Sequence, residues 1–492
     1  MYPGGIRMRF INTIFSATIL LFGASFTPAT YALENKCGAS FGDAVQLNEA
    51  RYDVYPNSGD DSGAIKCALD AAATQTGVNT VRLTAGTYIL SSDENGRSAI
   101  DVTDFQGTLE GDGINKTEVR IDEEVFDCSE AKARPIIFRG GNVTLQYLTI
   151  SATNPCDDSD EGSGRVNDRS DARPDATAHA ANTPPKPFRS EGGHSAFTLV
   201  SFAQKSCSAR SHFATLNRVR LLGLSPEEYN STGVSFFGTI DGSCEEEGKG
   251  PTGSFKVNQS EIGGFSTGVY SSVWGGGQVD ITNNTIASMA WGIYVEDANQ
   301  KLNVASNKIY VGDRLIGTTT YPWCCMVGIE IAANNDYAPK QNSSSISNNT
   351  ITMGEWAPKG TEYIESLGIL IAAWGTVRPT HPVSITNNTF ELSVPNSDEA
   401  WVWGVSVQDT NDALIKDNIF RGPGNVAIWF GAWGINEIAT GGTIIGNYFN
   451  KFESRGDQGT IDFGWSKDSL VFSNNGPHTV TGETETNVIL ID

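Results

Sequence analysis

Two glutamates in the second half of the chain have the type and the setting for acid–base chemistry. Glu296 ends the segment GIYVE and Glu330 stands inside the segment GIEIA, and both segments share one pattern. If these segments stack on one another, the two backbones lie about 8 Å apart. Two carboxylates within such reach can divide the hydrolysis of a glycosidic bond, one as proton donor and one as base or nucleophile. Asp297, next to Glu296, is a third catalytic candidate.

Aromatic residues gather around the same segments. Flat rings stack on the apolar faces of sugars, so a groove lined by them suits a long polymer. Tryptophan also serves as a core or loop-packing residue, and both roles stay open here. The candidate substrate-binding residues are Tyr270, Tyr294, Trp374, Gln408, Trp429 and Trp433.

These segments belong to an internal repeat that runs from about residue 255 to residue 475. One phrase reads VDITNNTI, NVASNKI, SSISNNTI and VSITNNTF in successive copies, and a second reads GIYVE, GIEIA and GILIA. Their alternation of branched apolar residues with other types predicts short strands with one buried face. The asparagines that align are Asn258, Asn284, Asn307, Asn349, Asn388, Asn418, Asn447 and Asn474.

Such copies must stack, because one copy alone cannot bury its apolar side. Parallel stacking in register places like residues about 4.8 Å apart. The asparagine column then becomes a ladder, in which each amide bonds its own turn and the next amide. Asparagine also tolerates a left-handed backbone, so we expect it at the tight bend itself. The predicted fold is all-β, a right-handed parallel β-helix, which is a solenoid.

Alternation along the second phrase assigns its side chains to two faces. The residues expected to point inward are Ile293, Val295, Ile329, Ile331, Ile369, Ile371, Val405 and Val407. The first outward column reads Tyr270, Tyr294, Glu330, Leu370, Ser406, Trp429 and Asp462. The second reads Ser272, Glu296, Ala332, Ala372, Gln408, Gly431 and Gly464.

The domain organisation is predicted from the remaining segments. Residues 1–32 have the basic start, apolar run and small-residue end of a secretory signal peptide. Residues 33–492 form one β-helix domain, of which 33–107 are an N-terminal cap region with an amphipathic helix at Asp60–Thr74. Residues 155–193 break the pattern as an irregular surface insertion.

The formal net charge of −23 makes nucleic acid and anionic membrane poor partners. We expect a monomer with no membrane partner after signal removal, secreted to the extracellular space or periplasm, with a polysaccharide as its partner. No cofactor or metal ligand is assigned. The acidic cluster at Asp157–Glu161 could hold Ca²⁺, or it could be a solvated loop.

Eight cysteines, all beyond the signal peptide, are compatible with disulfides in an exported protein. Neighbours in sequence suggest the pairs Cys37 with Cys67, Cys128 with Cys156, and Cys207 with Cys244. Cys324 and Cys325 are adjacent, and we favour two buried or separately paired thiols over a strained ring or a metal site.

The repeated asparagine phrase resembles the right-handed parallel β-helix, or pectate-lyase-like, superfamily of secreted carbohydrate-active proteins. The resemblance covers most of the mature chain, and it implies that the active site lies on the outward strand face. This fold carries lyases, hydrolases, esterases, epimerases, tailspikes and adhesins. The chain lacks the Arg-centred signature of pectate lyases, the Asp pairs with Gly-His-Gly of polygalacturonases, and the Asp-Pro-His-Glu of mannuronan epimerases.

The expected function is that of a secreted enzyme that cleaves a polysaccharide, by hydrolysis in preference to elimination. A lyase needs cations beside its base to neutralise a substrate carboxylate, and Lys301, Arg314 and Arg378 form no basic column. Two alternatives stay open. One is a polysaccharide lyase, with or without Ca²⁺, and the other is a non-catalytic glycan-binding surface protein.

Overall fold

The computed structural model describes most of the chain beyond the expected signal peptide. The described residues are 33–92, 98–121, 133–152, 197–206, 212–223, 231–238, 253–272, 277–296, 301–312, 325–333, 343–355, 363–373, 382–395, 399–408, 410–431, 439–455, 459–464, 466–482 and 488–491. Residues 35–492 form one compact unit and residues 1–34 another. The predicted signal peptide, the 155–193 insertion and the Asp157–Glu161 cluster therefore lie outside the described residues.

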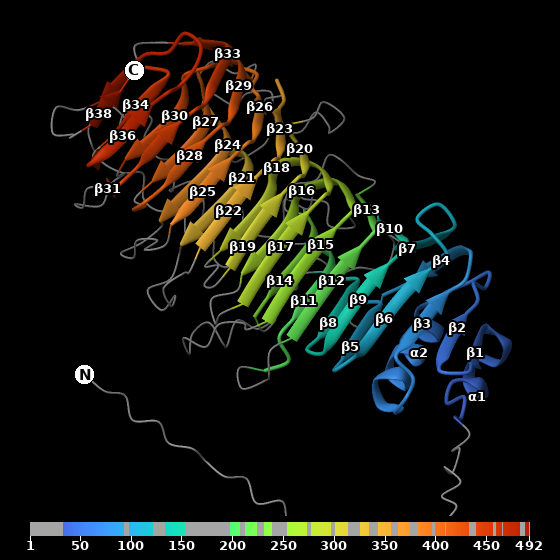
Figure 1. Ribbon diagram of the computed structural model, residues 1–492. Helices are drawn as coiled ribbons and strands as arrows, with labels where there is room; N and C mark the ends of the chain where they lie inside the picture. The colour runs from blue at the N-terminus through green and yellow to red at the C-terminus, as the bar shows by residue number, and fades with distance from the viewer. Residues whose placement is uncertain are drawn as a thin grey trace, which may run out of the picture. The chain divides into compact units, whose positions relative to one another are not determined.

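One long sheet collects the strands that precede each tight bend (Figure 1). Apart from the antiparallel pair β1–β2, its neighbours are parallel. In spatial order its strands are β1 (Val45–Asn48), β2 (Arg51–Val54), β3 (Thr80–Leu83), β6 (Gln106–Gly111), β9 (Asn142–Gln146), β12 (His212–Asn217), β15 (Gly253–Asn258), β17 (Gly277–Thr282), β19 (Lys301–Ala305), β22 (Ser343–Ser347), β25 (Val383–Thr386), β28 (Leu414–Lys416), β32 (Thr443–Ile445), β36 (Ser469–Phe472) and β38 (Val488–Ile491).

The second long sheet contains two parallel ladders that merge in β16 and β18. The ladder directly after the bends contains β4 (Gly86–Leu90), β7 (Thr117–Ile121), β10 (Thr149–Ala152), β13 (Arg220–Gly223), β16 (Glu261–Ser272), β18 (Thr285–Glu296), β20 (Lys308–Val311), β23 (Thr350–Met353), β26 (Thr389–Glu391), β29 (Ile419–Gly424) and β33 (Tyr448–Ser454).

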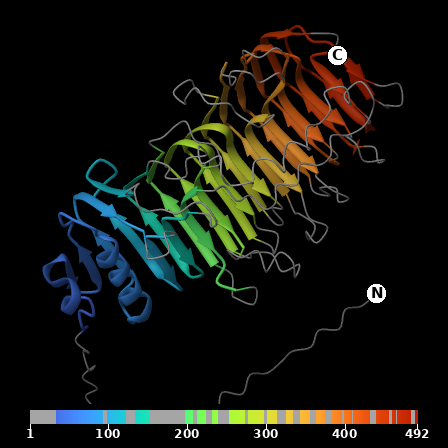
Figure 2. The ribbon, with the colours of Figure 1, turned by 180° about the vertical axis from the view of Figure 1, so that it is seen from behind.

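The other ladder carries the GIYVE-like phrases, and Figure 2 shows the stack from behind. Its strands are β5 (Ile100–Thr103), β8 (Ile136–Arg139), β11 (Phe197–Ala203), β14 (Ser231–Phe237), the second halves of β16 and β18, β21 (Cys325–Ala333), β24 (Tyr363–Ala373), β27 (Glu399–Gln408), β30 (Val426–Gly431), β34 (Ile461–Phe463) and β37 (Val480–Gly482). A short sheet pairs β31 (Ala439–Thr440) with β35 (Ser466–Lys467).

Each coil therefore contributes three strand segments that pair in parallel with their equivalents one coil along. This arrangement confirms the predicted parallel β-helix. The residues predicted to point inward, such as Ile293 and Ile329, are fully buried in one continuous apolar core. Phenylalanines stack within that core, with the ring centroids of Phe390 and Phe420 4.7 Å apart and the two ring planes nearly parallel.

The asparagine ladder is confirmed from Asn284 to Asn474. Asn307 shows the pattern: its Nδ2 donates to Asn349 Oδ1 at 2.9 Å and to the Ile281 carbonyl oxygen at 2.8 Å. The next oxygen, Asn349 Oδ1, also accepts the backbone N–H of Asn307 at 3.0 Å. Each amide is thus saturated inside the stack, which satisfies buried polar groups that would otherwise destabilise the fold.

Two details of that prediction are wrong. Asn258 is not a rung, because Ser260 takes the equivalent place and donates its backbone N–H to Asn284 Oδ1. The left-handed conformation belongs to the residue before each rung, as at Asn283 (φ 59°) and Asn348 (φ 57°). The rung itself is buried, because its amide must lie within the stack to reach the next coil.

The glycine that opens each GIYVE-like phrase is required by close approach between coils. A Cβ on Gly292 would lie 2.5 Å from the carbonyl oxygen of Gly328, and the same distance separates a Cβ on Gly328 from Gly368. Any larger residue would therefore push neighbouring coils apart. Because these glycines face the backbone of the next coil, they interrupt the alternation of side chains along the strand.

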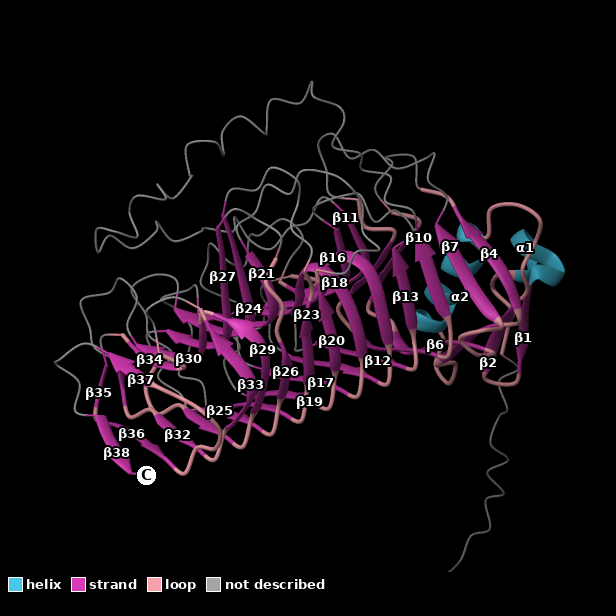
Figure 3. Ribbon diagram, turned by 90° about the horizontal axis from the view of Figure 1, so that it is seen from above, coloured by secondary structure: helices cyan, strands magenta, loops and turns pink. Residues whose placement is uncertain are grey.

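The N-terminal cap contains α1 (Gly38–Phe41), the 3-10 turn η1 (Gly42–Ala44) and α2 (Ser62–Thr74), and Figure 3 shows its helices in cyan at the end of the stack that begins with β1. Ile65 and Leu69 of α2 are fully buried in the same core as the coils, and α2 contacts β2, β3, β5 and β6. The predicted helical cap is confirmed. A disulfide joins Cys37 to Cys67 of α2, as predicted.

Candidate active site

The candidate site lies on the outward side of the ladder that contains β16, β18, β21, β24 and β27, called here the outer face. The first predicted column is confirmed throughout by strand register, from Tyr270 opposite Tyr294 to Trp429 opposite Asp462. In the second column, Glu296 stands between Ser272 and Ala332. Register places Glu330 opposite Tyr294, one coil along and two residues back from Glu296.

Glu296 ends β18 and is held by two tyrosines. The hydroxyl of Tyr270 donates to its Oε2 at 2.6 Å, and the hydroxyl of Tyr294 donates to its Oε1 at 2.6 Å. Glu296 as a whole is 5% exposed. Tyr294 reaches it from two residues earlier on the same side of β18, and Tyr270 reaches it from the preceding coil. This arrangement fixes both oxygens of a buried carboxyl group in one orientation.

Glu330 lies in the middle of β21 and is also 5% exposed. Its Oε2 accepts the indole N–H of Trp291 at 2.7 Å. Trp291 stands three residues before Tyr294, and it still points outward because Gly292 interrupts the alternation. A pair of acidic residues without a function would usually be solvated at the surface. Glu296 and Glu330 are both buried instead.

The two carboxylates are linked by aromatic rings in contact. The Trp291 and Tyr294 rings are stacked with centroids 6.1 Å apart, and the Tyr294 and Tyr270 rings meet edge to face at 5.6 Å. A continuous series of contacts therefore runs from Tyr270 through Glu296 to Glu330. Tyr294 and Trp291 are partly exposed, so their rings form the part of the site that a ligand can contact.

Farther along the outer face the side chains are apolar and packed. Trp429 is 4% exposed and stacks on Trp403 with ring centroids 5.9 Å apart, in a cluster that includes Leu370. Gln408 is 8% exposed and donates from Nε2 to Ser406 Oγ at 3.1 Å. The structure brings Tyr270, Tyr294 and the two glutamates together, and it places Trp429 in apolar packing. Sugar binding by Trp429 and Gln408 stays a prediction.

Three other site predictions fall on positions outside the described ranges: Asp297, Trp374 and Trp433. The same is true of the disulfide predictions Cys128 with Cys156 and Cys207 with Cys244. Cys325 is disulfide-bonded. Among the described residues, no group of three His, Cys, Asp or Glu side chains is placed to hold a metal ion, and no helix is long and apolar enough to cross a membrane.

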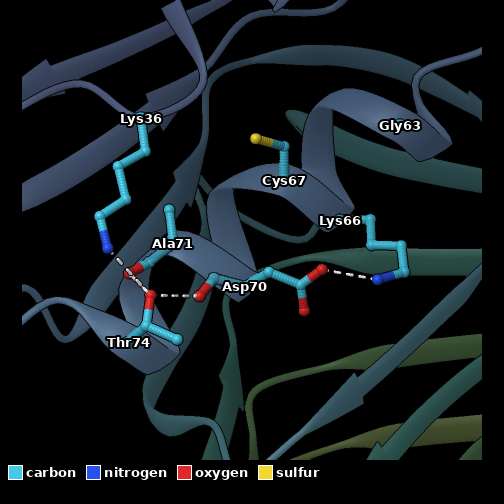
Figure 4. Close-up of a pocket in the computed structure, with 7 residues that line it drawn as sticks. All are labelled: Lys36, Gly63, Lys66, Cys67, Asp70, Ala71 and Thr74. Carbon is cyan, nitrogen blue, oxygen red and sulfur yellow. Dashed lines mark hydrogen bonds and ion pairs between the residues drawn. The ribbon is translucent and has the colours of Figure 1, made fainter.

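A shallow hollow lies on the cap beside α2, away from the outer face (Figure 4). Its charged groups bond one another or a side chain of α2. Lys66 pairs with Asp70 at 2.6 Å, and Lys36 Nζ donates to Thr74 Oγ1 at 3.2 Å. Cys67 in its floor belongs to the disulfide. We therefore place the candidate chemistry on the outer face and not in this hollow.

Two residues of the outer face were missed by sequence reasoning. Alternation alone does not identify Trp291 as a partner of Glu330, although the glycine after it signals the change of alternation. Arg134 lies more than one coil before the recognised repeat, and its guanidinium carbon is 4.6 Å from the ring centroid of Phe237. Phe237 belongs to one buried cluster with Tyr270. No periodicity in the sequence connects Arg134 to this place.

No protein-family model matches the chain, and no curated protein matches its sequence. Similar solved structures include the A-module of the mannuronan C-5 epimerase AlgE4 from Azotobacter vinelandii, with 14% identity over 89% of this chain and 95% of that one, at a TM-score of 0.43. The surface protein and adhesin PfbA of Streptococcus pneumoniae has 12% identity over 89% and 97%, at 0.41.

The catalytic domain of a GH87 alpha-1,3-glucanase has 12% identity over 91% of this chain and 69% of that one, at a TM-score of 0.36. These likenesses assign no activity to this chain. The fold rests on its own strand register, and the function has to be argued from the outer face.

Proposed function

We propose that this chain is an exported enzyme that cleaves a polysaccharide by hydrolysis at the outer face, with Glu296 and Glu330 as its catalytic pair. The observation that carries the proposal is the set of contacts that connects the two buried glutamates through Tyr270, Tyr294 and Trp291. Partly exposed rings beside two oriented carboxylates combine sugar stacking with acid–base groups. Export is supported by the Cys37–Cys67 disulfide, because such bonds persist in oxidising compartments.

The two glutamates take different roles in this proposal. Glu296 accepts two hydroxyl groups, and an ionised carboxylate only accepts hydrogen bonds, so Glu296 fits the base or nucleophile. Glu330 then acts as the proton donor to the leaving oxygen. The indole of Trp291 orients Glu330, and the ring of Tyr294 lies between the two carboxyl groups as a platform for the sugar.

The first experiment incubates the mature protein with neutral and acidic polysaccharides and follows reducing ends and near-ultraviolet absorbance together. Hydrolysis predicts reducing ends without absorbance. Glu296→Gln and Glu330→Gln should each lower kcat about 100-fold or more, the usual effect of losing an acid or base. The matched control is Glu261→Gln, at an exposed residue of β16 that pairs with Arg220, and it should keep full turnover.

Turnover that survives both Glu296→Gln and Glu330→Gln would remove this catalytic pair. Binding without any product, in the wild type and in both variants, would support the non-catalytic glycan-binding protein instead.

One observation favours a lyase as the second candidate. Tyr270 and Tyr294 hold their hydroxyls against a carboxylate, and a tyrosine hydroxyl is a possible base for removing the proton next to a uronic acid carboxylate. Elimination leaves a double bond in the product, so absorbance would rise with the reducing ends. In that case Tyr270→Phe or Tyr294→Phe should abolish turnover, whereas a hydrolase should keep part of it.

A further inference from the structure

Arg134 is a buried cation, and two of its three nitrogens have no hydrogen-bond partner among the described residues. Its side chain precedes β8 and is 3% exposed. Within the described part of the chain, neither its Nε nor its Nη1 has a hydrogen-bond partner. The ring of Phe237 covers the guanidinium at 4.6 Å. Such a ring stabilises the charge, but it offers no acceptor for the in-plane N–H groups.

A buried guanidinium with unpaired donors destabilises the folded chain. Burying a charge without a hydrogen-bonded counter-charge destabilises a protein by several kcal/mol. Burial and the neighbouring Arg139 lower the pKa of Arg134 to about 10, so the group remains a cation at neutral pH. Arg139 itself pairs with Asp101 at 2.7 Å, whereas no carboxylate bonds the Nε or Nη1 of Arg134 among the described residues.

The strand register places Arg134 on the outer face, on the same row as Trp291. Ala133 bridges Phe197, so Arg134 stands level with the next residue of β11. That row continues through Thr232 and Thr267 to Trp291. The side chain extends toward β14, where Phe237 shares a buried cluster with Tyr270 and Tyr294. The guanidinium therefore lies against Phe237, which packs with the tyrosines that hold Glu296.

A second unsatisfied group lies at the same place. Gln204 follows β11, is 3% exposed and donates its backbone N–H to the carbonyl oxygen of Phe237 at 3.3 Å. Its side-chain Oε1 has no donor within the described ranges. A cationic donor and a neutral acceptor are thus both buried near Phe237, and among the described residues Arg134 Nε and Nη1 and Gln204 Oε1 have no hydrogen-bond partner.

We propose that Arg134 binds an anionic group of the glycan, a carboxylate or a sulfate ester, while Gln204 accepts a hydroxyl of the same or the adjacent sugar. This inference rests on the proposed function, because it specifies the substrate of that site. The planar fork of an arginine matches the two oxygens of such a group. The substrate is therefore an acidic polysaccharide whose charged sugar binds on the N-terminal side of Glu296.

The test measures binding rather than turnover. Affinity electrophoresis compares polygalacturonate and alginate with the same polymers after chemical reduction of their carboxyl groups, and includes carrageenan as a sulfated probe. The wild type should bind an acidic probe, and reduction should abolish the preference for a uronate. Preference for carrageenan alone would identify the anion as a sulfate ester.

Arg134→Met should weaken binding to the acidic probe about 10- to 100-fold, the usual effect of a lost charged hydrogen bond. It should leave binding to the reduced polymer unchanged. Its Tm should be equal to or above that of the wild type, because an unpaired buried charge has been removed. Arg421→Met is the matched control, since Arg421 is 44% exposed and pairs with Glu391. It should change neither affinity.

If Arg134→Met fails to fold, Arg134→Lys tests the inference instead, because lysine keeps the positive charge and lacks the planar guanidinium that can bond two oxygens at once. It should weaken binding to the acidic probe and not to the reduced one. Equal affinity of the wild type for acidic and reduced polymers, or unchanged affinity in the Arg134 variants, overturns the inference. Cleavage of neutral glycans at the same rate as acidic ones would overturn this inference and support the proposed function. Selective binding of acidic glycans without any cleavage would support this inference and overturn the proposed function.

Discussion

Glu296 is almost completely buried, yet both of its oxygens accept a tyrosine hydroxyl. Arg134 and His212 show the opposite condition, with buried nitrogens that have no partner among the described residues. A buried polar group without a partner costs about 1 to 3 kcal/mol, so each such group has to be offset by the surrounding fold or used by a ligand. Arg134 lies on the outer face, whereas His212 stacks on Phe236 of the core.

His212 gives a prediction about stability and pH. Burial lowers the pKa of His212 from its ordinary 6.5 to about 4, so the folded chain keeps the ring neutral while the unfolded chain takes up a proton below about pH 6.5. Stability should therefore fall by about 3 kcal/mol as the pH drops from 6.5 to 4, and then level off. Urea unfolding at successive pH values measures this fall.

His212→Phe is the matched variant, because a phenyl ring can stack on Phe236 and cannot be protonated. The variant should lose this part of the pH dependence. An identical decline in the wild type and in His212→Phe would mean that other groups cause it.

At the scale of elements, the asparagine ladder ties one coil to the next. Asn388 donates from Nδ2 to the Ile346 carbonyl oxygen and to Asn418 Oδ1, and its own Oδ1 accepts the backbone N–H and the amide of Asn349. Each rung therefore satisfies buried groups on both sides. A single rung matters more than a single hydrogen bond because its loss leaves several partners unsatisfied.

Asn388→Ala should lower the free energy of unfolding by about 3 kcal/mol, since buried groups of three other residues lose a partner. Asn387→Ala is the control on the adjacent residue. Asn387 is exposed and left-handed (φ 57°), so alanine there should cost only about 1 kcal/mol. Guanidinium midpoints of the two variants measure the difference. Equal losses would mean that the bend, and not the ladder, holds the coils together.

At the scale of the whole molecule, the net charge of −23 opposes the substrate that Arg134 is inferred to bind. A long-range field repels an anionic polymer during approach, whereas the buried guanidinium acts only at contact. The two effects differ in their dependence on salt, because dissolved ions screen exposed charges and hardly reach buried ones.

The association rate of an acidic glycan should therefore rise with ionic strength. Between about 0.01 M and 0.1 M salt the screening length falls from about 30 Å to about 10 Å, which weakens the repulsion. Stopped-flow binding of an acidic oligosaccharide measures the rate, and its carboxyl-reduced form is the control that should show no salt dependence. A rate that falls with salt would indicate an attractive basic surface and contradict this account.

Repetition along the chain is enough to predict the coil. Alternation and the recurring asparagine predict the inward residues, most of the ladder and the register of the first outward column, because these depend only on neighbouring coils that repeat one phrase. Glu296, Glu330, Tyr270 and Tyr294 were found this way. The sequence also gave the cap helix and the Cys37–Cys67 pair, which are close in the chain.

Only the tertiary structure decided which outward side chains meet. Trp291 reaches Glu330 because Gly292 shifts the alternation, and Arg134 reaches Phe237 across coils whose spacing in sequence is irregular. It also decided that Trp429 packs in an apolar cluster. Periodicity fixes which face a side chain occupies, but its partners depend on burial, side-chain length and the coil to which the chain returns after each insertion.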